Sequence, residues 1–399
     1  MVLNKKIWVA VGFIIVAFTS ILVYARLHNE QSVTANTYQT WQKTFVTRQS
    51  DQATYVNAGV DGKKMAMSEA QGLGMLITAQ AGRKGWASQT DFDHLLAYYQ
   101  QNRLVVANQQ THLMNWRQRD VKGAWRTDAH SATDGDLYIA YALQVAASVW
   151  PKQATTYNTL AKTIAADILR YEYNDQQQLL TVGDWATADT AAYRVMRTSD
   201  VMPSVFTSLA ELTNDQRWGQ VSDSMLTKLA TLSKQHKTGL VPDFTVVTKQ
   251  GVRAAKAKEV ATKQDGHYAY NAARVPMMLA DSSDHRAVQI NRRLMHFFDQ
   301  QTQLLAGYTV TGKALHKYES NVFSAPIFYA AQSDADRYGK LYKTGATIYN
   351  RSVAQQPYYD ATLTALVAVG GFKNDKSNDR LWDATRGNQD GPRGEGFGS

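Results

Sequence analysis

The chain has 399 residues, of which 44% are hydrophobic and 19% are charged, so it can build a large core and wholesale disorder is excluded. Lys and Arg number 43 and Asp and Glu 34, which gives a net charge of +9 and leaves anionic partners open. With no cysteine, a disulfide scaffold, a thiolate zinc site and a cysteine nucleophile are all excluded.

The N-terminal segment, residues 1–30, is predicted to be a transmembrane or signal helix. Lys5 and Lys6 precede an uncharged run at residues 7–25, which is long enough for a hydrocarbon core of about 30 Å. The positive flank should stay cytoplasmic. Small residues at Ala25 and Ala35 would also permit cleavage. We therefore expect a signal-anchor that holds the protein at the extracellular face of the membrane, or a signal peptide that leaves it secreted.

Residues 31–372 are predicted to form one helical domain, because no linker rich in Pro, Gly or Ser interrupts them. Apolar residues recur at helical spacing, as at Leu160, Ile164 and Ile168, whereas the alternation typical of strands is scarce. About a dozen helices suggest paired helices in a solenoid or a closed double ring. They are expected at residues 36–58, 67–80, 91–107, 134–149, 154–171, 203–213, 217–234, 267–280, 285–300, 321–332, 335–350 and 357–369. Residues 373–399 are polar and are predicted to be a flexible tail.

Two loop-to-helix junctions place carboxyl groups at predicted helix starts. In Ser68-Glu69-Ala-Gln-Gly-Leu-Gly-Met, the simplest interpretation is that Ser68 caps the helix while Glu69 adds a favourable charge to its first turn. In Thr133-Asp134-Gly135-Asp136, two acids flank a glycine. Acids this close repel each other unless one of them binds a ligand or a cation. No further oxygen ligands follow at the spacing of a calcium loop.

A third junction follows the polar loop at residues 258–266 and brings Tyr268, Tyr270, Asn271 and Arg274 to a predicted helix start. Aromatic rings stack on sugar faces, and charged groups form paired hydrogen bonds with sugar hydroxyls. This residue set therefore suits a carbohydrate site. The alternative is an ordinary helix start at which Arg274 only reaches solvent.

Together these motifs resemble glycoside hydrolase family 8, which contains endo-acting β-1,4-glucanases, lichenases, chitosanases and some xylanases. Further matches are Asn115-Trp116-Arg117, Gly183-Asp184-Trp185, Arg197-Thr-Ser-Asp-Val-Met-Pro203 and Ser320-Asn-Val-Phe-Ser-Ala-Pro326. The resemblance spans roughly residues 40–370. It implies an all-α (α/α)6 barrel of about twelve helices and a polysaccharide substrate, with no cofactor and no metal.

The resemblance also implies an inverting single displacement by two carboxyl groups, one acting as acid and one as base. Glu69 matches the general acid, so its pKa should be raised by a desolvated setting. Asp134 matches the acid that holds the distorted sugar. The matched substrate-binding positions are Trp116, Asp136, Asp184, Trp185, Tyr268, Tyr270, Asn271 and Arg274.

The general base is the point at which this sequence departs from much of the family. Position 271 is an asparagine where many members carry an aspartate, and an amide cannot take the proton from water. The sequence resembles the subgroup of chitosanases and lichenases in which an upstream loop glutamate acts as base. Glu259 fits that role if the loop has gained two residues. Asp265 is a second candidate, and the absence of a working base is a third possibility.

Two classes of function follow from these alternatives. The first is an endo-acting, inverting glycoside hydrolase that cleaves a β-1,4-linked polysaccharide. The second is a catalytically weak or inactive polysaccharide-binding accessory of the cell envelope. The basic charge slightly favours a neutral β-glucan over polycationic chitosan. No dense basic stripe indicates nucleic acid. Membrane contact is expected through the N-terminal helix, and the protein is expected to be a monomer.

Overall fold

The computed structural model describes residues 5–373, apart from the side chains of residues 5–14, 17 and 21–28. This part of the chain contains twelve α-helices joined by short strands and loops. The helices are α1 (Lys5–Phe45), α2 (Ser68–Arg83), α3 (Gln89–Gln101), α4 (Thr133–Val149), α5 (Ala154–Tyr171), α6 (Pro203–Thr213), α7 (Arg217–Gln235), α8 (Val275–Ala280), α9 (His285–Asp299), α10 (Asn321–Gln332), α11 (Gly339–Gly345) and α12 (Tyr358–Val369). The predicted tail at residues 373–399 lies, beyond Lys373, outside the described residues.

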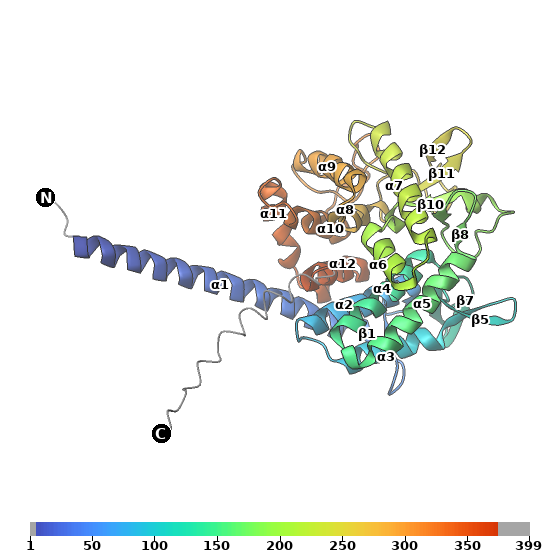
Figure 1. Ribbon diagram of the computed structural model, residues 1–399, viewed down its shortest axis with the longest axis horizontal. Helices are drawn as coiled ribbons and strands as arrows, with labels where there is room; N and C mark the ends of the chain where they lie inside the picture. Colours follow the sequence, from blue (N-terminus) through green and yellow to red (C-terminus); the bar gives the residue numbers. More distant parts are fainter. Residues whose placement is uncertain (1–4, 374–399) are drawn as a thin grey trace, which may run out of the picture.

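The even-numbered helices form a closed inner ring. Each of α2, α4, α6, α8, α10 and α12 contacts the next, and α12 contacts α2 again. Each inner helix also packs against an outer partner: α12 against α1, α2 against α3, α4 against α5, α6 against α7, α8 against α9 and α10 against α11. Figure 1 shows α2 to α12 gathered into one body. This arrangement agrees with the predicted (α/α)6 barrel.

Burial separates the two rings in the way that their sequences require. Helix α12 buries every residue from Ala361 to Val369, so it is covered on all sides, as an inner helix must be. Helix α7 instead buries one stripe, including Trp218, Val221 and Met225, and exposes the rest. The outer helices are therefore amphipathic, and the core lies inside the inner ring and between the two rings.

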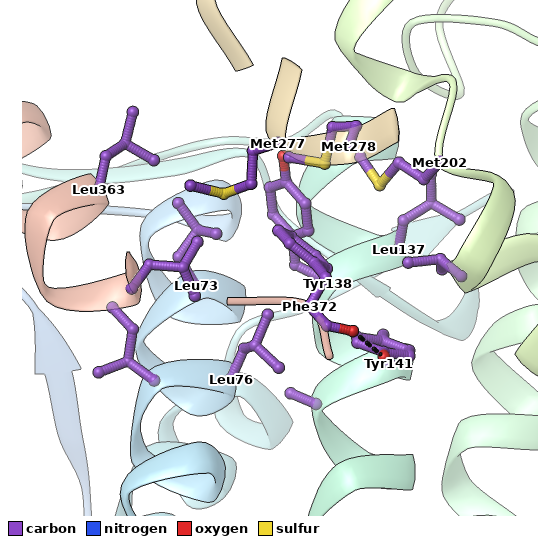
Figure 2. Packing of buried hydrophobic residues seen from close by; sticks show 14 of the residues in the cluster. Leu73, Leu76, Leu137, Tyr138, Tyr141, Met202, Met277, Met278, Leu363 and Phe372 are labelled. Carbon is purple, nitrogen blue, oxygen red and sulfur yellow. Dashed lines mark hydrogen bonds between the residues drawn. The ribbon is translucent and has the colours of Figure 1, made fainter. Parts of the chain in front are cut away.

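One end of the inner ring is closed by the C-terminal segment after α12. The ring of Phe372 packs against Tyr138 and Tyr141, with centroids 5.7 and 5.9 Å away, and Figure 2 shows it between these two side chains. The Tyr141 hydroxyl donates a hydrogen bond of 2.6 Å to the carbonyl oxygen of Phe372. Because α4 begins at the other end of the ring, the carboxyl groups at its start lie opposite this closure.

Twelve short strands, which the sequence analysis did not predict, connect the helices in the described residues. They are β1 (Val46–Arg48), β2 (Thr54–Val56), β3 (Met65–Met67), β4 (Arg103–Val106), β5 (Gln109–Met114), β6 (Arg117–Val121), β7 (Ala124–Asp128), β8 (Tyr173–Asn174), β9 (Leu179–Leu180), β10 (Val195–Arg197), β11 (Phe244–Thr248) and β12 (Gly251–Ala254). All their pairings are antiparallel. Strands β5, β7, β8 and β10–β12 lie on the side away from the free end of α1 (Figure 1).

Tight turns explain why several predicted helices end early. The helix expected at residues 91–107 ends at Gln101, because Ala107 and Asn108 both take positive φ angles, 47° and 63°, and turn β4 back onto β5. The helix expected at 36–58 likewise ends at Phe45, where β1 begins to pair with β2. The helix expected at 267–280 begins only at Ala272, because Tyr268 pairs with Tyr308 as extended backbone.

Helix α1 runs without a break from Lys5 to Phe45 and passes through the predicted boundary at residue 30. Its last turns pack into the body, with Tyr38 and Trp41 fully buried, while its first part extends away from the body in Figure 1. Ile15, Val16 and Phe18 are exposed. Among the residues that the structure describes, no helix has the length and apolarity of a membrane span. The predicted span at residues 7–25 is therefore not supported there, and most of its side chains are not described.

Candidate active site

The chemically important side chains gather where the inner helices begin. Glu69 and Asp134 are the second residues of α2 and α4, and Asp200 and Arg274 close the 3-10 turns that lead into α6 and α8. The amino-terminal end of a helix carries a partial positive charge and free N–H groups. Several such ends meeting at one rim of the ring therefore form a setting that favours carboxylates.

Close packing of α2 on α4 brings Glu69 and Asp134 together. A Cβ added at Gly135 would lie 2.3 Å from the Ser68 Oγ, and one added at Gly72 would lie 2.6 Å from the Tyr138 Cβ. The glycines are therefore required by the helix crossing. The prediction that Ser68 caps α2 is wrong, because the N-cap is Met67 and the Ser68 side chain is buried against α4.

Two buried arginines hold Asp134 from both sides. The Arg197 Nη1 lies 2.7 Å from the Asp134 Oδ1, and the Arg274 Nη1 donates a hydrogen bond of 3.1 Å to the Oδ2. Arg274 is 1% exposed and also donates to the hydroxyl groups of Tyr138 and Ser199, at 3.0 and 2.9 Å. The interpretation that Arg274 merely reaches solvent is therefore wrong.

Glu69 lies beside the same guanidinium but is held less tightly. Its Oε1 is 3.7 Å from the Arg274 Nη1, outside hydrogen-bond distance, and accepts no hydrogen bond from the described residues. Burial raises the pKa of Glu69 to about 7, against the pull of Arg274. Burial alone would raise the pKa of Asp134, but Arg197 and Arg274 outweigh burial and hold this pKa below its ordinary value. The site thus pairs an acid that keeps its proton below a pH of about 7 with an acid whose pKa is lowered.

Three further residues complete this cluster, and none of them was assigned a role from the sequence. Burial raises the pKa of Asp200 to about 7, and its Oδ2 lies 3.5 Å from the Arg197 Nη1. Tyr359 at the start of α12 donates a hydrogen bond to the Tyr270 carbonyl oxygen at 3.4 Å. Arg197 and Asp200 belong to the segment at residues 197–203, which matched the family but received no predicted role. The signal in the sequence that could have identified Asp200 is its position just ahead of the helix that begins at Pro203.

Asp136 and Asp184 accept hydrogen bonds from backbone N–H groups near the start of α4. The Asp136 Oδ1 accepts a 2.8 Å hydrogen bond from the Met114 N–H and the side chain is fully buried, so no substrate reaches it in this conformation. The Asp184 Oδ1 accepts a 2.7 Å hydrogen bond from the Ser131 N–H, and the Ser131 Oγ donates to Glu172 at 2.5 Å. Burial raises the pKa of Glu172 to about 8, so this carboxyl group also keeps its proton at neutral pH.

Three of the predicted aromatic residues remain accessible. Trp116, Trp185 and Tyr270 are 38%, 40% and 40% exposed. The Trp116 carbonyl oxygen accepts a 2.9 Å hydrogen bond from the Ser68 N–H, so the Trp116 backbone lies next to the Glu69 helix start, and the Arg117 guanidinium lies 4.3 Å from the centroid of the Trp116 ring. Tyr268 differs, because it is fully buried against Phe298 and Phe323 and has no ring face open to a sugar.

The two candidate bases lie in the loop that follows β12. Glu259 forms a bidentate ion pair with Arg253, with N–O distances of 2.6 and 2.8 Å, which lowers its pKa to about 2. Asp265 is fully buried and accepts hydrogen bonds from the N–H groups of Val260, Ala261 and Thr262. The buried Asp265 side chain therefore holds the backbone of this loop in place, whereas Glu259 lies near the surface.

A cavity of about 570 Å³ lies away from these carboxyl groups. Its lining includes Tyr141, Pro203, Glu211, Asp281 and Phe372, which places it near the closed end of the ring. Among residues 5–373, no group of three or more His, Asp or Glu side chains is placed to hold a metal ion.

A closed double ring of helices with paired carboxyl groups, arginines and open aromatic rings at one rim defines a carbohydrate-cleaving class of protein. A model of the glycosyl hydrolases family 8 matches residues 11–371. The chain belongs to this family and is a glycoside hydrolase. A β-glucanase from Niallia circulans is 30% identical over 315 residues, which cover 75% of this chain and 74% of that protein.

Other relatives agree with this assignment. An endoglucanase from Bacillus sp. strain KSM-330 is 27% identical over 75% of this chain and 67% of its own. The apo structure of a β-1,3-1,4-glucanase from Paenibacillus sp. X4 has a TM-score of 0.76 and 26% identity, covering 86% of this chain and 93% of that one. The xylose complex of Rex8A from Paenibacillus barcinonensis, at 20% identity and a TM-score of 0.68 over 86% and 94% of the two chains, shares the fold.

Proposed function

We propose that this protein is an endo-acting β-glucanase that inverts the anomeric carbon in a single displacement. The names of its relatives, a β-glucanase and an endoglucanase, support the substrate class. The observation that carries the mechanism is the opposite pKa shift of two carboxyl groups, Glu69 and Asp134, beside the Arg274 guanidinium. Glu69 keeps a proton up to a pH of about 7, while Asp134 is held as a carboxylate by Arg197 and Arg274.

Each residue has a defined task in this mechanism. Glu69 donates its proton to the glycosidic oxygen as the bond between that oxygen and the anomeric carbon breaks. A water molecule on the opposite face of the sugar forms the new bond to that carbon and gives its proton to the base. Asp134 stabilises the positive charge that develops on the sugar ring, and Trp116, Trp185 and Tyr270 supply stacking surfaces.

The proposed base is Glu259, and it needs a rearrangement to act. A carboxylate with a pKa of about 2 is a weak base, so the ion pair with Arg253 must open when substrate binds. The sequence places both residues on one short segment, with Arg253 in β12 and Glu259 in the following loop. A local movement of that loop would therefore release the carboxylate.

The first test measures release of reducing ends from lichenan, carboxymethylcellulose and chitosan by the full-length chain. Glu69→Gln should lower turnover on the preferred polymer by about 10²- to 10⁴-fold while binding survives, because the amide has no proton to give. Glu211→Gln, at an exposed position of α6, is the matched control and should leave turnover unchanged. Near-normal turnover in Glu69→Gln would reject Glu69 as the acid.

Two further readouts test the remaining parts of the mechanism. Proton NMR of the first product should detect the inverted anomer, and a retained anomer would remove the single displacement. Viscosity of carboxymethylcellulose should fall faster than reducing ends appear, because internal cuts shorten chains efficiently. The value of kcat/KM should fall as pH rises through about 7, where Glu69 loses its proton.

The ion pair of Glu259 with Arg253 favours a second candidate function, a catalytically weak polysaccharide-binding protein. If Glu259 is never released, the aromatic residues still bind a sugar chain while no carboxylate activates water. Binding without hydrolysis of any of the three polymers, in the parent and in Glu69→Gln alike, would support this alternative.

We also propose that the protein acts at the extracellular face of the membrane or after secretion. The uncharged run at residues 7–25 behind Lys5 and Lys6 supports this, as do the exposed side chains of Ile15, Val16 and Phe18. Fractionation of cells that express the full chain or a form lacking residues 1–30 tests the proposal. Equal recovery of both forms in the cytoplasm would contradict it.

A further inference from the structure

Asp243, just ahead of β11, supports the helix start that carries Arg274. It is 4% exposed, and its Oδ1 accepts hydrogen bonds from the N–H groups of Ala269, Asn271 and Ala272 at 3.0, 3.1 and 2.7 Å. Its Oδ2 accepts a fourth, at 3.3 Å, from the side-chain Nδ2 of Asn271. One carboxylate therefore holds both the backbone of this turn and the amide side chain at position 271.

The amide of Asn271 links that carboxylate to the active-site guanidinium. Its Nδ2 donates to Asp243, and its Oδ1 accepts a 3.1 Å hydrogen bond from the Arg274 Nη2. An amide has one donor end and one acceptor end, so its orientation is fixed by a carboxylate on one side and a guanidinium on the other. Neither neighbour tolerates the reversed amide.

Arg274 connects Asn271 to the two carboxyl groups of the proposed active site. Its Nη1 contacts Asp134 and Tyr138 and lies 3.7 Å from the Glu69 Oε1. A shift of the guanidinium would change the electrostatic environment of both carboxyl groups at once. The order of contacts is thus Asp243 to Asn271, Asn271 to Arg274, and Arg274 to the Glu69 and Asp134 pair.

We propose that Asp243 is a positioning residue that acts through Asn271 on Arg274, and that its carboxylate is the reason why position 271 carries an amide. An aspartate at 271 would place a second carboxylate against the Asp243 Oδ2, where the amide now lies at 3.3 Å. Two carboxylates at such a short distance do not both stay ionised. This inference rests on the proposed roles of Glu69 and Arg274.

The surroundings of Asp243 make such a conflict severe. Burial raises the pKa of Asp243 to about 6 in spite of its four hydrogen bonds. The buried Tyr268 phenol is a titratable group that interacts with Asp243, and the Asn271 amide lies between Asp243 and Arg274. No cation among the described residues forms an ion pair with Asp243 to absorb a second negative charge.

A double-mutant cycle tests the link. Asn271→Asp should lower kcat about tenfold at pH 7.5, a coupling expected for residues that share a hydrogen bond. The loss should shrink as pH falls, because a carboxyl pair that shares one proton again offers one donor and one acceptor. Asp243→Asn should also lower kcat about tenfold, since two amide donors would then face each other.

The double variant Asp243→Asn/Asn271→Asp exchanges the two groups and should recover most of the kcat lost by either single variant. In this exchange the amide introduced at position 243 would donate to the carboxylate introduced at position 271, which would still accept from Arg274. The combination of Asp91→Asn with Asn271→Asp is the matched control and should not recover, because Asp91 accepts from Ser88 at the start of the outer helix α3. Additive effects in the Asp243 cycle would overturn the proposal, and so would an Asn271→Asp variant as active as the parent from pH 5 to 9.

Thermal unfolding of the same four proteins gives a readout that needs no hydrolysis. Both single variants should lower the Tm at pH 7.5 and the double variant should restore it. If the parent protein fails to hydrolyse any polymer but the Tm cycle couples, the proposed function fails and the link stands. If hydrolysis is normal and both cycles are additive, the link fails and the proposed function stands.

Discussion

At the level of single residues, burial and arginine contacts together separate the pKa values of two neighbouring carboxyl groups. Glu69 and Asp134 both sit at helix starts beside Arg274, yet their pKa values move in opposite directions. Asp134 has a second arginine at 2.7 Å, whereas Glu69 has none within hydrogen-bond distance. One guanidinium therefore lies beside a carboxyl group with a raised pKa and one with a lowered pKa, and the proposed mechanism uses the first as proton donor and the second as a fixed negative charge.

The role of Glu259 is tested by removing the cation that holds it. Arg253→Gln should raise the pKa of Glu259 from about 2 towards its ordinary value, because the bidentate hydrogen bonds from Arg253 are its main cause. A base works only when deprotonated, so the acid limb of the kcat/KM profile should move to higher pH. The measurement is a pH profile on the preferred polymer from pH 3 to 8.

The matched control for that profile is Arg217→Gln, which removes an exposed arginine paired with Asp215 at 2.6 Å on the outer ring. Its acid limb should coincide with that of the parent. An acid limb that also stays in place in Arg253→Gln would transfer the base role away from Glu259.

At the level of elements, the crossing of α2 and α4 sets the distance between the helix starts that carry Glu69 and Asp134. Gly135→Ala would place a methyl group 2.3 Å from the Ser68 Oγ and 2.6 Å from the Ser68 carbonyl carbon, and the second of these atoms is backbone. The helices must separate, so we expect a loss of about 1–3 kcal/mol in the free energy of unfolding and a large loss of turnover. Urea denaturation followed by the reducing-end assay checks both effects.

Gly219→Ala provides the comparison for that substitution. Gly219 lies in the outer helix α7 with no atom within 4 Å of an added Cβ, so alanine should stabilise the protein by up to about 1 kcal/mol through helix propensity. Turnover should not change. Equal stability of the two glycine variants would mean that the α2–α4 contact is looser than the structure indicates.

At the level of the whole molecule, the ring buries several acids whose pKa values are raised by burial. The values reach about 7 for Glu69, about 7 for Asp200 and about 8 for Glu172. A group whose pKa is higher in the folded state holds more protons there than in the unfolded chain. Stability is then greatest below the unfolded pKa and falls as pH rises through the folded value. The Tm should therefore decrease between about pH 4.5 and pH 8.

Calorimetric scans of the full chain at pH 5 and pH 8 measure this dependence. Glu172→Gln removes one of the buried acids without changing its shape and should reduce the difference in Tm between the two pH values. The Ser131 hydroxyl can still donate to the amide oxygen at position 172, so the fold should persist. A Tm that rises steadily from pH 5 to pH 8 would contradict the burial of these acids in their protonated forms.

Much of the helical framework was predictable from the sequence, because its pattern is local. The helices expected at residues 154–171 and 203–213 agree in their bounds with α5 and α6. The hairpin of β4 and β5 was missed because its turn residues, Ala107 and Asn108, carry no strong turn signal. The helix start at Ala272 was placed too early because extended pairing of Tyr268 with Tyr308 overrides the local pattern.

The candidate site divides in the same way. Glu69, Asp134 and Arg274 were visible as charged residues at predicted helix starts, and the structure brings them into contact. Tyr268 and Asp136 shared those segments but are fully buried, because the sequence gives the order of side chains and not the face on which each one lies. Asp243 was overlooked, since its partners Ala269, Asn271 and Ala272 are distant in the chain.

The sequence alone determined the helical periodicity, the absence of thiol chemistry and the motifs that identify the family, because these depend on residue type and local spacing. The tertiary structure decided which acid has a raised pKa and which has a lowered one, since that depends on burial and on arginines contributed by other elements. It also decided that Glu259 meets Arg253 and that Asn271 meets Asp243. A pKa reflects the three-dimensional neighbourhood of a group, and only the folded chain brings Asp134 and Arg274, 140 positions apart, within 3.1 Å.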